Sequence, residues 1–167
     1  LFLERDGMTF SFYDGAFFHN IHHGEQIEKL NFHAYKIHFQ GCNVPKTTLT
    51  KYNSGVINYY LGNDPSKWAQ GVKGGKEVYY QNIYDNIDFR IYTKDESIKY
   101  DFIVHPGGKV SDIKLRFEGL DRLFIKDSEL FMQTSLGTVI DSKPIAIQNS
   151  DSIRLSFQLN KSIVSFD

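Results

Sequence analysis

Residues 87–104 read IDFRIYTKDESIKYDFIV, and this stretch decides the fold class. Apolar and polar residues alternate in its first part, the period of a strand with one buried and one solvated face. The apolar members there are Ile87, Phe89 and Ile91, and the polar ones are Asp88 and Arg90. The polar segment at residues 93–97 separates this part from a second alternating run. The stretch therefore predicts an antiparallel hairpin.

The same period recurs through the chain. Further apolar rows are Tyr35, Ile37 and Phe39; Ile98, Tyr100, Phe102 and Val104; Ile113, Leu115 and Phe117; Ile153, Leu155, Phe157 and Leu159; and Val164 and Phe166. Turn-forming residues separate the rows at residues 5–8, 105–108, 135–137 and 149–151. The sequence predicts an all-β fold, an antiparallel β-sandwich of many short strands.

At most one short helix is expected. Asp64 precedes Pro65, which suits an N-cap followed by a first helical residue, and the segment to Gln70 allows one or two turns. We expect Trp68, one turn on, to anchor one end of the sandwich. Two other regions lack alternation: residues 14–31 predict a surface loop lying against the sandwich, and residues 41–55 predict a crossing between sheets.

The length and charge of the chain limit the number of domains and the kinds of partner that we expect. The chain has 167 residues, which predicts a single domain spanning 1–167. The 19 basic and 20 acidic residues are interspersed, so no basic stripe indicates a nucleic-acid partner. No apolar run approaches the ~20 residues of a membrane span, and membrane insertion is not expected. Because the chain starts at Leu1 inside a predicted strand, we expect a segment of a longer modular protein.

Histidines cluster at His19, His22 and His23, with Glu25 nearby. Zinc sites use closely spaced histidines, but this segment has no strand or helix pattern to present them on one face. We interpret the cluster as a solvated loop and predict neither a metal site nor a cofactor. The single Cys42 lies in a turn-like stretch and is interpreted as a structural thiol.

Acid–base chemistry has weak candidates. The pairs Asp85/Asp88 and Asp95/Glu96 lie in or beside predicted turns, where such side chains commonly bond the backbone. Asp101 and His105 are four residues apart, roughly 13 Å along a strand and too far for a catalytic pair. No phosphate-binding loop or serine nucleophile motif is present. We predict no catalytic residues.

Aromatic residues concentrate between positions 59 and 84. Neighbouring tyrosines in a strand point to opposite faces, so one of each pair can be exposed, and exposed aromatic rings bind sugars or proteins. The alternative is that these rings pack in the core, and burial of Trp68 would favour a scaffold over a glycan site. The candidate ligand-binding residues are Tyr59, Tyr60, Trp68, Tyr79 and Tyr84, with Tyr80 in the same concentration.

Three motifs carry a family resemblance: NYYLGNDPSKW at 58–68, VYYQNIY at 78–84 followed by Ile87-Asp88, and YDFIVHPG at 100–107. In this order they resemble the amino-terminal β-domain, a domain of unknown function, of large bacterial secreted and cell-surface proteins. Such proteins carry β-propeller-like repeats, polycystic-kidney-disease-type domains or gliding-motility (type IX secretion) sorting domains. Asp85-Asn86 replaces the family's usual Pro-Gly, and residues 14–31 have no counterpart in it.

The resemblance implies secretion or display on the bacterial cell surface, in adhesion, gliding or matrix building. The leading hypothesis is a non-enzymatic structural or interaction module whose partners are other domains of its parent protein, or an extracellular glycan or protein. The alternatives are a carbohydrate-binding module that uses the exposed aromatics and a polysaccharide-active enzyme domain.

Overall fold

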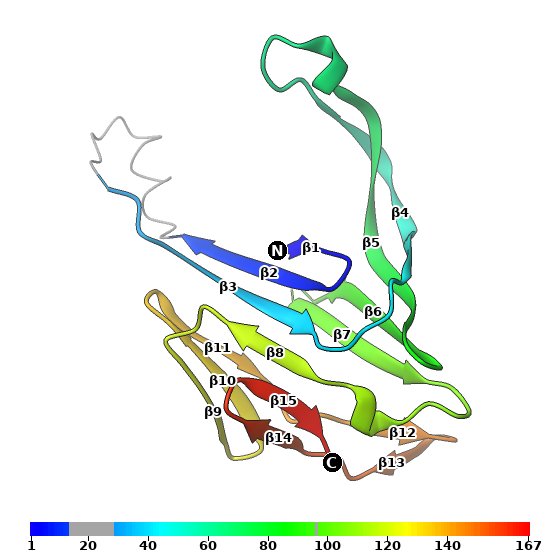
Figure 1. Ribbon diagram of the computed structural model, residues 1–167. Coiled ribbons are helices and arrows are strands. Elements are labelled where there is room, and N and C mark those ends of the chain that lie inside the picture. The colour runs from blue at the N-terminus through cyan, green and yellow to red at the C-terminus, as the bar shows by residue number, and fades with distance from the viewer. Residues whose placement is uncertain (14–28, 96) are drawn as a thin grey trace. The chain divides into compact units, whose positions relative to one another are not determined.

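The computed structural model describes residues 1–13, 29–95 and 97–167, and antiparallel strands dominate it (Figure 1). The strands are β1 (Phe2–Leu3), β2 (Gly7–Tyr13), β3 (Phe32–Phe39), β4 (Lys46–Tyr59), β5 (Ala69–Tyr84), β6 (Ile87–Lys94), β7 (Ser97–Val104), β8 (Leu115–Glu118), β9 (Arg122–Lys126), β10 (Glu129–Thr134), β11 (Gly137–Asp141), β12 (Ala146–Gln148), β13 (Asp151–Ile153), β14 (Phe157–Asn160) and β15 (Ile163–Phe166).

The predicted fold class is confirmed: the chain is all-β, antiparallel and sandwich-like. Helical structure in the described residues is limited to two 3-10 turns, η1 (Pro65–Lys67) and η2 (Val110–Asp112). The described residues form two compact units, residues 1–42 with 110–167, and residues 43–109. The expectation of a single domain stays a prediction.

The first unit contains a six-stranded sheet in the order β1-β2-β3-β8-β15-β14, a three-stranded sheet β11-β10-β9 and the hairpin β12-β13. The predicted row on β3 is confirmed, since Tyr35, Ile37 and Phe39 are buried. The imidazole of His33 ties β3 to the three-stranded sheet. Its Nε2 donates to the carbonyl of Gly119 (2.7 Å), and its Nδ1 accepts from the amide of Ser135 (3.2 Å).

One predicted row of this unit is wrong in part. Residues 153–159 do not make one strand, because β13 ends at Ile153 and β14 begins at Phe157. Ile153 lies in the two-stranded hairpin with β12 and is exposed, whereas Phe157 pairs with Phe166 and is buried. The alternation of apolar and polar residues continues between β13 and β14, but the two strands pair in different sheets. Strand β13 belongs to the two-stranded hairpin, and β14 belongs to the six-stranded sheet.

The second unit is a four-stranded meander, β4-β5-β6-β7. The predicted alternation on β6 is confirmed: Ile87, Phe89 and Ile91 are buried, and Asp88 and Arg90 lie on the opposite face. The hairpin predicted at residues 93–97 joins β6 to β7. Asp88 therefore lies in strand β6, as the alternation predicted, and directly follows the turn at residues 85–86.

The irregular crossing predicted for residues 41–55 is also wrong, because β4 occupies most of it. Its residues pair with β5 from Lys46↔Gln81 to Tyr59↔Ala69. Polar β-branched residues such as Thr47 and Thr48 gave no apolar alternation, yet they suit an extended strand. The loop predicted at residues 14–31 lies mainly outside the described residues, together with His19, His22, His23 and Glu25.

Candidate functional site

The β4–β5 hairpin extends far beyond the sheet that holds its base (Figure 1). Strand β6 pairs with β5 only from Glu77 onward, so the outer parts of β4 and β5 pair only with each other. We call residues 51–73 the arm. Every residue of the arm is exposed. A two-stranded ribbon with no core buries little apolar surface, so we expect the arm to add little to the stability of the domain.

Three of the sequence-predicted ligand residues lie at the tip of the arm. Tyr59 ends β4, Tyr60 follows it, and Trp68 follows η1. The side chains of Tyr60 and Trp68 are 54% and 38% exposed, and their rings meet edge to face with centroids 5.3 Å apart. The expectation that Trp68 anchors an end of the sandwich is wrong, because the hairpin carries the ring to its tip.

The tip is ordered by local hydrogen bonds. As predicted, Asp64 caps η1: its carboxylate accepts from the amide (3.1 Å) and hydroxyl (2.7 Å) of Ser66. The indole Nε1 of Trp68 donates to the carbonyl of Gly62 (3.1 Å). The side-chain oxygen of Asn58 accepts from the amide of Gly71 (2.8 Å), which ties the two strands together below the tip. The rings of Tyr60 and Trp68 are thus held in place although no core supports them.

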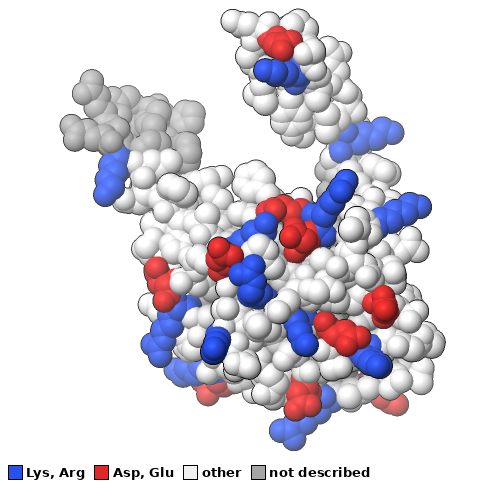
Figure 2. Space-filling view, in the orientation of Figure 1, with Lys and Arg blue, Asp and Glu red and all other residues white. Residues whose placement is uncertain are grey.

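Apolar side chains also run along the arm. The exposed ones are Tyr52, Val56, Ile57, Tyr59, Tyr60, Leu61, Trp68 and Val72. The charged residues between positions 51 and 73 are three lysines and one aspartate, and the hairpin at the top of Figure 2 shows a mostly uncharged surface. A concentration of exposed large apolar side chains of this kind indicates an interaction site on a soluble protein.

The other two predicted residues do not join the tip. Tyr84 is 3% exposed, and the neighbouring Tyr80 is 1% exposed. Tyr79 is half-buried on the polar face of the meander, where its hydroxyl bonds Asp88. The structure thus separates the aromatic concentration into tip residues, core residues and one member of a polar cluster.

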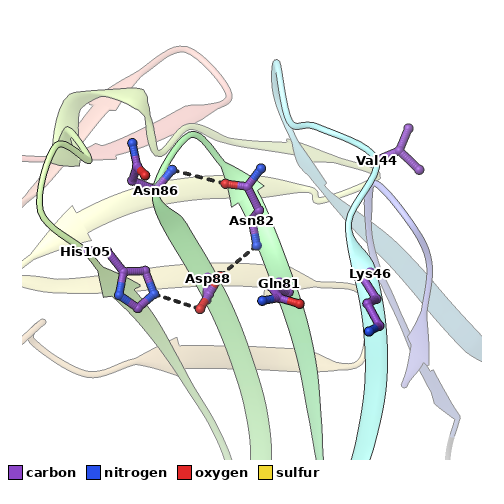
Figure 3. Close-up of a pocket in the computed structure, with 7 residues that line it drawn as sticks. All are labelled: Val44, Lys46, Gln81, Asn82, Asn86, Asp88 and His105. Atoms are coloured by element: carbon purple, nitrogen blue, oxygen red, sulfur yellow. Dashed lines mark hydrogen bonds and ion pairs between the residues drawn. The ribbon is translucent and has the colours of Figure 1, made fainter.

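That polar cluster borders a hollow of about 490 Å³ in the second unit (Figure 3). It is lined by Val44, Lys46, Gln81, Asn82, Asn86, Asp88 and His105. The nearly buried carboxylate of Asp88 accepts from the backbone amide of Asn82 (2.7 Å) and from Nε2 of His105 (2.8 Å). Because a carboxylate only accepts, Nε2 of His105 carries the proton.

Two opposing effects set the pKa of Asp88. Burial raises it, whereas the hydrogen bonds from the Asn82 amide, His105 and Tyr79 lower it, as does positive charge on His105. The net result is a pKa below the ordinary value, so Asp88 is ionised at neutral pH. Glu77, at the base of the arm, also has a lowered pKa, chiefly because Lys51 donates to it (2.7 Å).

Sequence reasoning missed this cluster. It judged Asp101 and His105 too far apart to pair, and the structure gives them different partners: Asp101 pairs with Arg90, and His105 with Asp88. A register shift between Tyr80 and Tyr84 aims the Asn82 amide at Asp88, and Asn82 has a positive φ of 57°. The only indication of this cluster in the sequence is the group of amide side chains between positions 81 and 86.

Comparison with known families decides the classification. A family model described as Domain of unknown function (DUF7948) matches residues 1–167. The chain belongs to the DUF7948 family. Comparisons with curated proteins and with solved structures found no match.

The structure also places the remaining sequence-based candidates of this DUF7948 domain. Asp85 lies in the predicted turn, but within the described part of the chain its carboxylate accepts from the side-chain amide of Asn43 (3.0 Å) and not from the backbone as expected. Burial raises the pKa of the Cys42 thiol, which favours its protonated form. Among the described residues, no three His, Cys, Asp or Glu side chains gather as metal ligands, and no helix is long and apolar enough to cross a bilayer.

Proposed function

We propose that this DUF7948 domain is a non-enzymatic interaction module of an exported bacterial protein and that its arm binds a protein partner. The observation that carries the proposal is that the aromatic side chains at the tip of the arm are both exposed and ordered. Tyr60 and Trp68 are exposed, yet η1, its Asp64 cap and the Trp68–Gly62 hydrogen bond order the tip that carries them. Pre-ordered aromatic rings lose little conformational entropy when they bind.

The arm suits a protein partner better than a small ligand. Apolar residues extend from Tyr52 near its base to Leu61 at its tip, so a partner would cover the ribbon along its length. Tyrosine and tryptophan are enriched in the buried centres of protein interfaces. The resemblance to modular surface proteins supports a partner within the same parent protein, in an adhesion, gliding or matrix role and in a secreted or cell-surface setting.

A carbohydrate-binding module is the second candidate function. It is favoured by the exposure of Trp68, since flat exposed rings stack on sugar faces. The edge-to-face contact with Tyr60 leaves part of the indole ring open for such stacking.

Amide hydrogen exchange tests the proposal. Exchange of residues 51–73 is compared between the isolated 1–167 chain and the intact parent protein. We expect rapid exchange in the isolated chain, because the ribbon lacks a core, and about tenfold or greater protection in the parent. The double variant Tyr60→Ser/Trp68→Ser should remove that protection.

Phe32→Ser is the matched control, because Phe32 is an exposed aromatic residue of β3 in the first unit. It should leave protection of the arm unchanged. Equal exchange of the arm in both contexts would contradict a partner within the parent protein. Binding of the isolated domain on a glycan array, lost in Trp68→Ser, would replace the proposal with the carbohydrate-binding function.

A further inference from the structure

The hollow beside Asp88 is bordered by exposed polar side chains whose hydrogen-bonding groups are free for a ligand. Exposed Lys46 has no ion-pair partner in the described part of the chain, and the exposed side-chain amides of Gln81 and Asn86 have no hydrogen-bond partner there. Lys46 is a donor only, and each amide offers two N–H groups. These side chains border one hollow, with Lys46 on the opposite side from His105 (Figure 3).

The one carboxylate in the hollow is already occupied. Asp88 accepts from the Asn82 amide, from His105 and from Tyr79. It therefore has little capacity left to hold Lys46 or a cationic ligand. Asn82 likewise uses its side-chain oxygen to accept from the amide of Asn86 (3.2 Å), and its own NH₂ group remains a donor.

These groups define the complementary ligand. A lysine without an ion-pair partner fits an oxyanion, and a single lysine matches a single negative charge, as in a carboxylate. The amides of Gln81 and Asn86 can both donate and accept, which suits hydroxyl groups around that carboxylate. A volume of about 490 Å³ is within the range of small-molecule sites.

We propose that the hollow binds the carboxylate of a hydroxyl-rich acid, of which a hexuronic acid is the simplest example. Lys46 pairs with the carboxylate, and Gln81, Asn82 and Asn86 bond its oxygens and the ring hydroxyls. Asp88 is a positioning residue that fixes His105 at one border of the site. The site is separate from the arm and does not depend on the proposed function.

Chemical-shift titration of the full chain tests this site with D-glucuronate and D-glucose as probes. The two sugars differ only in a carboxylate against a hydroxymethyl group. For an open site with one ion pair we expect a Kd of about 1 mM for glucuronate, and at least tenfold weaker binding of glucose. The shifts should centre on the amides of Gln81, Asn82, Asn86 and His105.

Lys46→Met should weaken glucuronate binding about tenfold, because it removes the charge and keeps much of the chain length. Lys99→Met is the matched control: Lys99 is exposed on β7 of the same sheet, outside the hollow. It should leave the affinity unchanged, and so should Tyr60→Ser/Trp68→Ser, which tests the arm alone. Retained amide spectra of both lysine variants would show that they are folded.

Three outcomes would overturn the proposal. Equal binding of glucose, or no loss in Lys46→Met, would show that the carboxylate is not recognised. Equal or tighter binding of N-acetylglutamate amide would show that the hydroxyls are not recognised and would indicate an acidic protein side chain. Equal competition by inorganic phosphate would show a nonspecific anion site.

Discussion

At the scale of single residues, Asp88 connects three neighbours that lie outside its own strand. Its carboxylate joins the Asn82 amide on β5, the Tyr79 hydroxyl on the same strand and His105 just after β7. Hydrogen bonds to a buried charged group contribute more to stability than neutral ones. The ionised form of Asp88 is therefore part of what holds the bulged end of β5 to β6.

We expect Asp88→Asn to lower the free energy of unfolding by about 1.5–3 kcal/mol at pH 7, since it removes the charge from these bonds. The folded-state pKa of Asp88 lies below its ordinary value of 3.8. Its contribution is thus fully present above that value and is lost as the pH falls through the lower, folded-state pKa. Urea denaturation at pH 7 and near pH 3 would measure the difference.

Asp85→Asn is the control, because Asp85 is exposed and accepts one bond from Asn43. It should change stability by no more than about 0.5 kcal/mol. A stability deficit of Asp88→Asn that is equally large at both pH values would show that packing, and not charge, is responsible.

At the scale of elements, Gly75 lies where the arm leaves the sheet. It pairs with Tyr52, and the register of β4 and β5 shifts beyond that pair. A Cβ atom at Gly75 would lie 2.6 Å from Cδ1 of Leu49 and 2.9 Å from the backbone carbonyl of Thr50. The backbone contact cannot be relieved by a rotamer change, so the absence of a side chain there permits the close approach of the strands.

Gly75→Ala should destabilise the domain by about 1–3 kcal/mol, the usual cost of overpacking. Gly55→Ala, within the arm, should be neutral or slightly stabilising, because a Cβ there meets no atom within 4 Å. Thermal denaturation of both variants would measure the contrast. Equal stability of the two variants would show that β4 moves freely against β5 at this point.

At the scale of the whole molecule, antiparallel pairing between strands forms the sheets of both units. The buried side-chain polar atoms of the described residues all have hydrogen-bond partners within the chain. Family membership extends over residues 1–167 and thus covers both units.

We expect the 1–167 chain to unfold in one cooperative transition, as a single domain does, and its melting temperature to be unchanged by a chelator. Calorimetry with and without EDTA would measure both properties. Two resolved transitions would show that residues 43–109 unfold separately from the rest. A chelator-dependent loss of stability would assign a metal to residues outside the described ranges, such as His19, His22 and His23.

The sequence by itself determined the strands with one apolar face. Alternation placed Tyr35, Ile37 and Phe39, and likewise Ile87, Phe89 and Ile91, on buried faces, because each strand carries its own period of two. It also located the cap of η1, since Asp64 and Pro65 act on the residues next to them. These features are local and need no knowledge of the neighbouring strand.

Only the tertiary structure decided the arm and the hollow. Whether Trp68 is buried depends on what lies beside the hairpin, and a ribbon of two strands has nothing to cover its tip. The contact between Asp88 and His105 depends on the register of β6 against β7, and the Asn82 contact depends on a bulge in β5. Register and bulges arise from pairing between strands, so the alternation within one strand does not predict them.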